Sequence, residues 1–194
     1  MSETELPVPK LAVRLFGGAA IEQGGAPLAD RAAHRHVIAL LAVLATARGR
    51  LMSRDKVVAL LWPDGEPEAV RHRLNVLLYD VRRILGRSAI VSVNDAIRLD
   101  PEAVWVDVVR FAGALRRGAI DEAVALYRGE FLDGFHLDDA REFDEWASGE
   151  RHRFAGDLQR GLEQAAARAA AAGDHESAIR HWRHLAHLDP LGAR

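Results

Sequence analysis

The segment 35–47, RHVIALLAVLATA, is apolar on nearly every face when it is drawn as a helix. A helix of this kind has to be enclosed on all sides, by a sheet and by other helices. It is therefore predicted to be the buried centre of the first half of the chain.

Short strands are predicted before this helix. Between positions 11 and 16, Leu11, Val13 and Leu15 alternate with Ala12, Arg14 and Phe16. Glycine pairs at 17–18 and 24–25 indicate the turns of a small antiparallel sheet. No GxxxxGK[ST] pattern follows these glycines, so hairpin turns are favoured over a phosphate loop.

Two further helices are predicted after the helix 35–47. Ser53 is an N-cap ahead of a helix over 56–62, which Pro63-Asp64-Gly65 ends. The next helix, over 66–85, has the clearest periodicity in the chain. Its apolar stripe, which we expect to face the core, consists of Val70, Leu74, Leu77, Leu78, Val81 and Leu85.

The opposite face of the helix 66–85 is unusual for a merely solvated surface. It offers an amide, a phenol, an imidazole and several guanidiniums, which are groups that contact base edges and phosphates. An ordinary arginine-containing surface helix is the alternative. We expect Asn75 and Tyr79 to face bases and arginines to face phosphates or guanine. The candidate DNA-binding residues on this helix are Arg71, His72, Asn75, Val76, Tyr79, Arg82 and Arg83.

A hairpin is predicted over 90–99, because Asn94-Asp95 tolerates the positive φ of a tight turn between two short strands. A small antiparallel sheet, three helices and a C-terminal hairpin make an α+β winged helix, assigned to residues 1–103. In that arrangement the third helix enters the major groove and the hairpin lies beside it. Arg98 on the hairpin is a further candidate DNA-binding residue.

The region 104–194 is predicted to be an all-α domain. The pattern of Gly118, Ala123 and Tyr127 returns 55 positions later as Gly173, Ala178 and Trp182. Small residues followed by an aromatic residue are typical of stacked helix pairs of the tetratricopeptide kind. We therefore expect antiparallel helix pairs in which Tyr127 and Trp182 are buried, with a long helix over 141–172 between the two copies.

The charge is divided unevenly along the chain. Residues 34–98 carry eleven Lys/Arg against six Asp/Glu, whereas residues 105–194 carry twelve against sixteen. A basic first half suits a polyanion, and an acidic second half suits a protein partner or solubility. The chain has no cysteine, no apolar stretch of membrane-spanning length and no signal-peptide pattern, so a cytoplasmic protein without a membrane partner is expected.

Neither a metal site nor catalysis is predicted. His175, His181, His184 and His187 drift around the predicted helix and have no matching carboxylate beyond Glu176. No nucleophile elbow is present, and the acidic residues at 138–145 fit a loop and a helix start. We expect no enzyme, no cofactor and no metal.

Several sequence segments resemble one bacterial family. In the first half they are LFGG (15–18), LLAVLA (40–45), GRLMSRDKVVALLWPD (49–64) and RHRLNVLLYDVRRILG (71–86). In the second half they are VWVDVVRF (104–111), EAVALYRGEFLDGF (122–135), Trp146 with Glu150-Arg151, and LDP (188–190). Together they resemble the streptomycete antibiotic regulatory proteins, in which an OmpR-like winged helix precedes a bacterial transcriptional activator domain.

The resemblance implies that the first domain binds direct-repeat promoter sites and that the second supports dimerisation or couples DNA binding to another module. It also implies that the loop before the recognition helix faces RNA polymerase. Two departures are visible: Ala96-Ile97-Arg98-Leu99 lacks the family's glycine and aromatic residue in the wing, and the sequence ends at 191–194 where a further helix is expected, so the second domain is expected to be incomplete. The polymerase-facing residues are Trp62, Asp64 and Glu66.

The leading hypothesis is a sequence-specific, DNA-binding transcription regulator, an activator by its resemblance. Its expected partners are double-stranded DNA, RNA polymerase and a second copy of the chain. The alternative is a protein-interaction module whose winged helix no longer binds DNA. The face from Arg71 to Arg83 distinguishes the two hypotheses.

Overall fold

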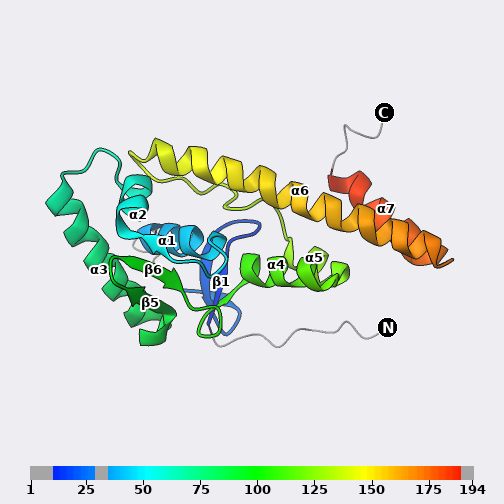
Figure 1. Ribbon diagram of the computed structural model, residues 1–194, viewed down its shortest axis with the longest axis horizontal. Helices are drawn as coiled ribbons and strands as arrows, with labels where there is room; N and C mark the ends of the chain where they lie inside the picture. Colours follow the sequence, from blue (N-terminus) through cyan, green and yellow to red (C-terminus); the bar gives the residue numbers. More distant parts are fainter. Residues whose placement is uncertain (1–10, 29–34, 189–194) are drawn as a thin grey trace.

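The computed structural model describes residues 11–28 and 35–188 (Figure 1). In the first half, strands, three helices and a hairpin follow one another as the sequence predicts, with an additional short strand at Met52–Ser53 and a 3₁₀ helix at Arg87–Ala89. The elements are β1 (Leu11–Arg14), β2 (Ala20–Gln23), β3 (Ala26–Pro27), α1 (Arg35–Thr46), β4 (Met52–Ser53), α2 (Arg54–Leu61), α3 (Pro67–Leu85), the short 3₁₀ helix η1 (Arg87–Ala89), β5 (Ile90–Val93) and β6 (Ala96–Leu99).

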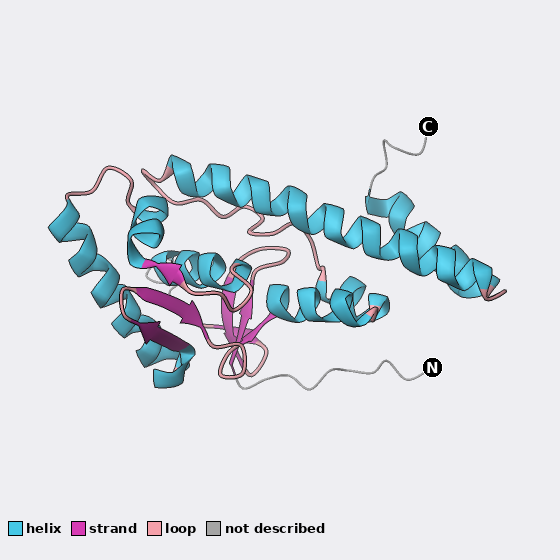
Figure 2. Cartoon of the chain, viewed as in Figure 1, coloured by secondary structure: helices cyan, strands magenta, loops and turns pink. Residues whose placement is uncertain are grey.

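After one short strand, the second half is helical (Figure 2). No helix in the described part of the chain is both long and apolar enough to cross a membrane. The expected early end of the second domain, at 191–194, lies outside the described residues. The elements are β7 (Trp105–Val106), α4 (Asp107–Arg117), α5 (Ile120–Leu126), α6 (Arg141–Ala171) and α7 (His175–Leu188).

Helix α1 is the buried centre of the first half, as predicted. Every residue from Val37 to Ala45 is buried. The helix contacts α2, α3, α4 and β6, so its apolar faces are covered from several directions. The prediction from its all-round apolar character is confirmed.

Two small sheets flank this helix. One is four-stranded in the order β3-β2-β1-β7, and the other is three-stranded in the order β4-β6-β5. The predicted hairpin is confirmed, with Asn94 at a φ of 50° in its turn. The sequence predicts an all-α region over 104–194, but β7 at its start pairs in parallel with β1 and brings Val106 beside Val13. A strand of two residues is too short to show an alternating pattern.

Helix α3 buries the whole predicted stripe, from Val70 to Leu85. Pro67 occupies its first turn, where its missing N–H leaves no intrahelical bond unmade. Gly86, at a φ of 99°, ends the helix. Periodicity alone therefore predicted which face of α3 is inside and which is outside.

The two halves share one apolar core. The ring of Phe16, which follows β1, lies 5.2 Å from Phe111 of α4, 4.8 Å from Tyr127 and 5.1 Å from Phe154 of α6. The core cluster is continuous from the first sheet to α6. The domain boundary between residues 103 and 104 remains a prediction.

The backbone after β1 is also held by the second half. The buried carboxylate of Asp107 accepts hydrogen bonds from the N–H groups of Leu15 (2.8 Å) and Phe16 (3.0 Å) through Oδ2. The N–H of Leu132 donates to the carbonyl of Leu15 at 2.7 Å, and the N–H of Gly17 donates to the carbonyl of Glu130 at 3.0 Å. These bonds join β1 to the start of α4 and to the loop after α5.

Gly17 has a second reason to be glycine besides its turn. Its φ is 69°, and a Cβ there would lie 2.7 Å from the carbonyl oxygen of Arg128. Gly129 faces it, because a Cβ on Gly129 would lie 2.8 Å from the Cα of Gly17. Two backbones therefore touch at this point, and a side chain on either one would separate them.

The helical half is only partly as predicted. The helices α4 and α5 contact each other, and α7 packs along α6, as Figure 1 shows. The prediction that Trp182 is buried is wrong, since 51% of it is exposed. α7 buries only Ala178 and His181. Truncation of Trp182 should therefore leave no large cavity.

Tyr127 is half-buried rather than buried, and its ring packs against Phe16 from the first half. The repeat pattern is preserved where Gly118 and Gly173 adopt positive φ and where Ala123 and Ala178 are buried. It fails at the aromatic position. The tetratricopeptide-like assignment remains a prediction.

Replacing Gly17 by Ala should lower the free energy of unfolding by about 2 to 4 kcal/mol, from a strained positive φ and a clash with the backbone of Arg128. Gly24→Ala is the matched control, since Gly24 has a φ of 59° but open space around its Cβ position. Its cost should be about 1 kcal/mol. Urea unfolding measures both, and equal losses would contradict the close approach at Gly17.

Burial raises the pKa of Asp107 to about 6, although the backbone N–H groups of Phe16, Leu15 and Val108 and the charge of Arg14 act to lower it. The Asp107 carboxyl therefore binds its proton more tightly in the folded state than in the unfolded chain. The stability that this carboxyl contributes is present below about pH 4 and is lost as the pH rises through 6. By linkage the loss is of the order of 3 kcal/mol.

Comparison with Asp107→Asn isolates this effect, because the amide does not titrate. The difference in unfolding free energy between the two proteins, followed in urea from pH 4 to 7, should shift in favour of the variant by that amount. A difference that stays constant, or shifts toward the native protein, would show that the pKa of Asp107 is not raised.

Candidate nucleic-acid interface

Helix α3 presents most of the predicted residues to solvent. Arg71, His72, Asn75 and Arg83 are exposed. Two less polar side chains stand among them, with Val76 47% and Tyr79 66% exposed. The buried stripe on the opposite face fixes this orientation, since successive helical residues are 100° apart.

Arg54 at the start of α2 is a central residue of this surface that sequence reasoning missed. Its Nη1 donates a hydrogen bond of 2.8 Å to Oδ1 of Asn75. Its backbone N–H donates to the carbonyl of Asp95 at 3.0 Å, and its Nε lies 3.8 Å from the Asp95 carboxylate. One side chain therefore connects α2, α3 and the turn of the β5–β6 hairpin.

The sequence did contain a signal for Arg54. It occupies the first position of α2, directly after the N-cap Ser53, whose side chain accepts from the N–H of Lys56. The helix dipole disfavours a cation at that end. An arginine placed there against the dipole needs a partner, and the Asn75 amide and the Asp95 carboxylate are such partners.

A second bond ties α3 to the hairpin. Nη2 of Arg82 donates to the Ser92 hydroxyl at 3.0 Å, and Arg82 is half-buried. Arg83 lies farther out and pairs with Asp80 at 3.4 Å within the helix. Arg98 lies on the outward face of β6, between the buried Ile97 and Leu99. The three arginines thus differ in how free they are before any ligand binds.

The loop before α3 is fixed by two contacts. The ring of Trp62 stacks on His36 of α1, with centroids 5.3 Å apart and an interplanar angle of 11°. A Cβ on Gly65 would overlap the side chain of Val70, and the N–H of Gly65 donates to the Trp62 carbonyl. Trp62 is therefore held against the protein, whereas Asp64 and Glu66 are exposed.

His36 beneath Trp62 is held toward its neutral form. Burial lowers its pKa first, and the charges of Arg73 and Arg35 lower it further, while Asp138 opposes them. A neutral imidazole stacks on the indole without bringing a charge into the interface.

Within the described residues, no group of three or more His, Cys, Asp or Glu side chains is placed to hold a metal ion. His181 is buried, and its Nδ1 lies 3.9 Å from Asp121 of α5. The chemistry that the exposed α3 surface offers is hydrogen bonding and charge: one amide, one phenol, one imidazole and guanidiniums. Those groups are suited to a polar, anionic partner.

The comparisons with known proteins concern the helical half and the fold. Residues 109–194 match the family described as bacterial transcriptional activator domain. Among solved structures, Mycobacterium tuberculosis EmbR in complex with a low affinity phosphopeptide is similar at 20% identity, with a TM-score of 0.61. The similarity covers 93% of this chain and 51% of the EmbR chain. No curated protein matches significantly.

This chain thus spans about half the length of the EmbR chain that it resembles, and at this identity the likeness concerns the fold alone. The match over 109–194 begins within α4 and so covers the helical half. The second half of this chain is accordingly similar to the bacterial transcriptional activator domain, and the fold as a whole is of the kind found in EmbR.

Proposed function

We propose that the chain is a sequence-specific DNA-binding transcription activator whose helix α3 enters the major groove. The observation that carries the proposal is the exposed face of α3, where Asn75, Val76 and Tyr79 stand among arginines while the opposite stripe is buried. The match of the helical half to the bacterial transcriptional activator domain supports regulation of transcription as the setting.

The hydrogen bond from Arg54 prepares Asn75 for base recognition. It assigns the amide oxygen to the Arg54 side and leaves the Nδ2 hydrogens free to donate. An amide oxygen has two lone pairs, so it can accept from a base while it still accepts from Arg54. Asparagine in this state presents one donor and one acceptor, the pair that adenine offers in complementary form in the major groove.

The remaining surfaces fit the same function. The hairpin turn lies next to α3 through Arg54 and Arg82, where it can contact the DNA backbone. The exposed Asp64 and Glu66 in the loop before α3 are the residues that would face RNA polymerase. We also propose that two copies of the chain bind direct-repeat promoter sites, as the family resemblance implies.

A protein-interaction module is the second candidate. The exposure of Val76 and Tyr79 favours it, because large side chains with apolar surface are also typical of protein interfaces. The two candidates differ in their dependence on salt and on base sequence. Both differences can be measured on an operator selected from random duplex DNA with the wild-type protein.

Asn75→Ala should weaken binding to the selected operator by about 5- to 150-fold, the equivalent of a lost bidentate base contact of about 1 to 3 kcal/mol. Binding to random DNA should change little. Gln159→Ala is the matched control, since Gln159 is an exposed amide on α6, away from α3. Fluorescence anisotropy measures both affinities. An equal loss on operator and random DNA would contradict base recognition by Asn75.

Arg71→Ala should weaken binding to operator and random DNA alike and make the slope of log K against log salt shallower by about one unit. Arg71 suits this test because it is exposed and pairs with no carboxylate of the described residues. Arg82 is less suitable, since its loss would also free the hairpin. If Asn75→Ala and Arg71→Ala both fold and bind DNA as the wild-type protein does, the protein-interaction module replaces DNA binding as the proposed function.

A further inference from the structure

A cavity of about 270 Å³ lies between the end of α1 and helix α4, and no residue of α3 lines it. It is partly open to solvent and large enough for a small organic molecule. Leu44 and Leu99 from the first half, and Val109 and Phe154 from the second, supply apolar lining. The cavity is thus shared by both halves.

The polar part of the lining is strongly cationic. Five arginines line the cavity, against one acidic residue, Glu102. Guanidinium groups bind carboxylate and phosphate through paired, parallel hydrogen bonds. The arginines are Arg48, Arg110, Arg116, Arg117 and Arg153.

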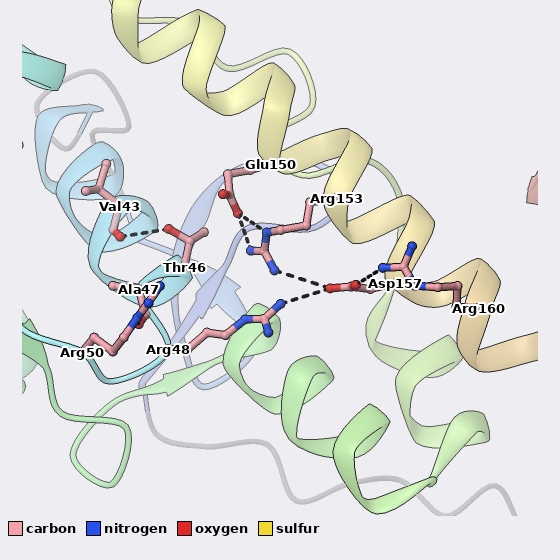
Figure 3. A network of polar contacts seen from close by, with 9 residues as sticks. All are labelled: Val43, Thr46, Ala47, Arg48, Arg50, Glu150, Arg153, Asp157 and Arg160. Carbon is pink, nitrogen blue, oxygen red and sulfur yellow. Dashed lines mark hydrogen bonds and ion pairs between the residues drawn. The ribbon is translucent and has the colours of Figure 1, made fainter. Parts of the chain in front are cut away.

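Three of these arginines are already paired. Figure 3 shows Arg48 and Arg153 converging on Asp157 of α6, at 3.1 and 3.4 Å, with Glu150 also bound to Arg153. Arg117 pairs with Glu122 at 2.9 Å. Neither Arg110 nor Arg116 pairs with a carboxylate in the ranges 11–28 and 35–188. The unpaired positive charge at the cavity therefore comes from Arg110 and Arg116.

The helix dipole does not account for both of them. Arg116 lies in the last turn of α4, where a cation is favoured. Arg110 lies near the opposite end of the same helix, where the dipole disfavours a cation. Both arginines are exposed and line the same cavity, so both guanidiniums are accessible to a ligand there.

Gly113 places guanidiniums at this wall. A Cβ on Gly113 would lie 3.2 Å from Nη1 of Arg117 and 3.8 Å from Nη2 of Arg116, so both groups lie over the bare backbone. Glycine inside a helix costs about 0.5 to 1 kcal/mol relative to alanine. Gly113 lines the cavity, so the methyl group of an alanine there would take up space in it, pressing on the Arg117 guanidinium and only touching that of Arg116.

We propose that this cavity binds a small organic anion, with its carboxylate or phosphate held by Arg110 and Arg116 and its apolar body against Val109 and Phe154. Residues of α1 and of α4 both contact such a ligand, so it favours the present arrangement of the two halves. The binding itself is independent of the proposed DNA contacts.

Phenyl phosphate and benzoate are suitable probes, because each joins a phosphate or a carboxylate to an apolar ring. Benzyl alcohol keeps the ring without the charge, and inorganic phosphate keeps the charge without the ring. Backbone amide shifts in ¹⁵N-labelled protein locate and quantify binding. We expect saturable shifts confined to the lining of the cavity, at residues 44–49, 99–102, 108–117 and 153–154, with at least one ring anion, and at least tenfold weaker binding of benzyl alcohol and inorganic phosphate.

Arg110→Gln combined with Arg116→Gln should weaken the ring anion at least tenfold. Arg141→Gln, an exposed arginine at the start of α6, is the control for charge and should change nothing. Gly113→Ala should also weaken binding while leaving unfolding in urea unchanged or more difficult. The proposal is overturned if no ring anion shifts these amides, if benzyl alcohol binds equally well, or if the double variant binds as wild type does.

Discussion

The insertion of Phe16 into the helical half is the interaction on which the rest of the structure depends. Its ring contacts Phe111, Tyr127 and Phe154, and the backbone around it is bonded to Asp107 and to the loop before α6. Buried N–H groups need partners, and for Leu15 and Phe16 those partners come from residue 107. The first sheet is therefore completed by the part of the chain that sequence patterns assign to another domain.

This dependence has a consequence for the surface of α3. Helix α1 contacts α3 on one side and α4 on another, and Arg48 beyond its end pairs with Asp157 of α6. A change in how the helical half packs would thus reach α3 through a buried helix, without passing through a flexible linker. A tightly packed core transmits a displacement because it has few voids in which to absorb it.

The sequence predicted those features that are determined by residues close together in the chain. The all-round apolar α1, the stripe of α3 and the Asn94-Asp95 turn each depend on neighbouring residues, and each was predicted correctly. The exposed face of α3 followed by elimination. The role of Arg54 and the pairing of β7 depend on partners about 20 and 90 residues away in sequence, so no local period revealed them. The repeat at Trp182 showed which residues are alike, but not whether a neighbouring helix covers them.

The arginines of the α3 surface also differ in what DNA would have to replace. Arg82 would give up Ser92, and Arg83 would give up Asp80, before either could hold a phosphate. A hydrogen bond to DNA that replaces a hydrogen bond within the protein adds little net affinity. An arginine that starts in water gains the energy of the new contact minus the cost of removing its bound water. Arg54 need not be exchanged at all, since it can hold Asn75 in both states. Under the proposed DNA binding, affinity should therefore arise at Arg71, and the orientation that specificity requires should arise from Arg54.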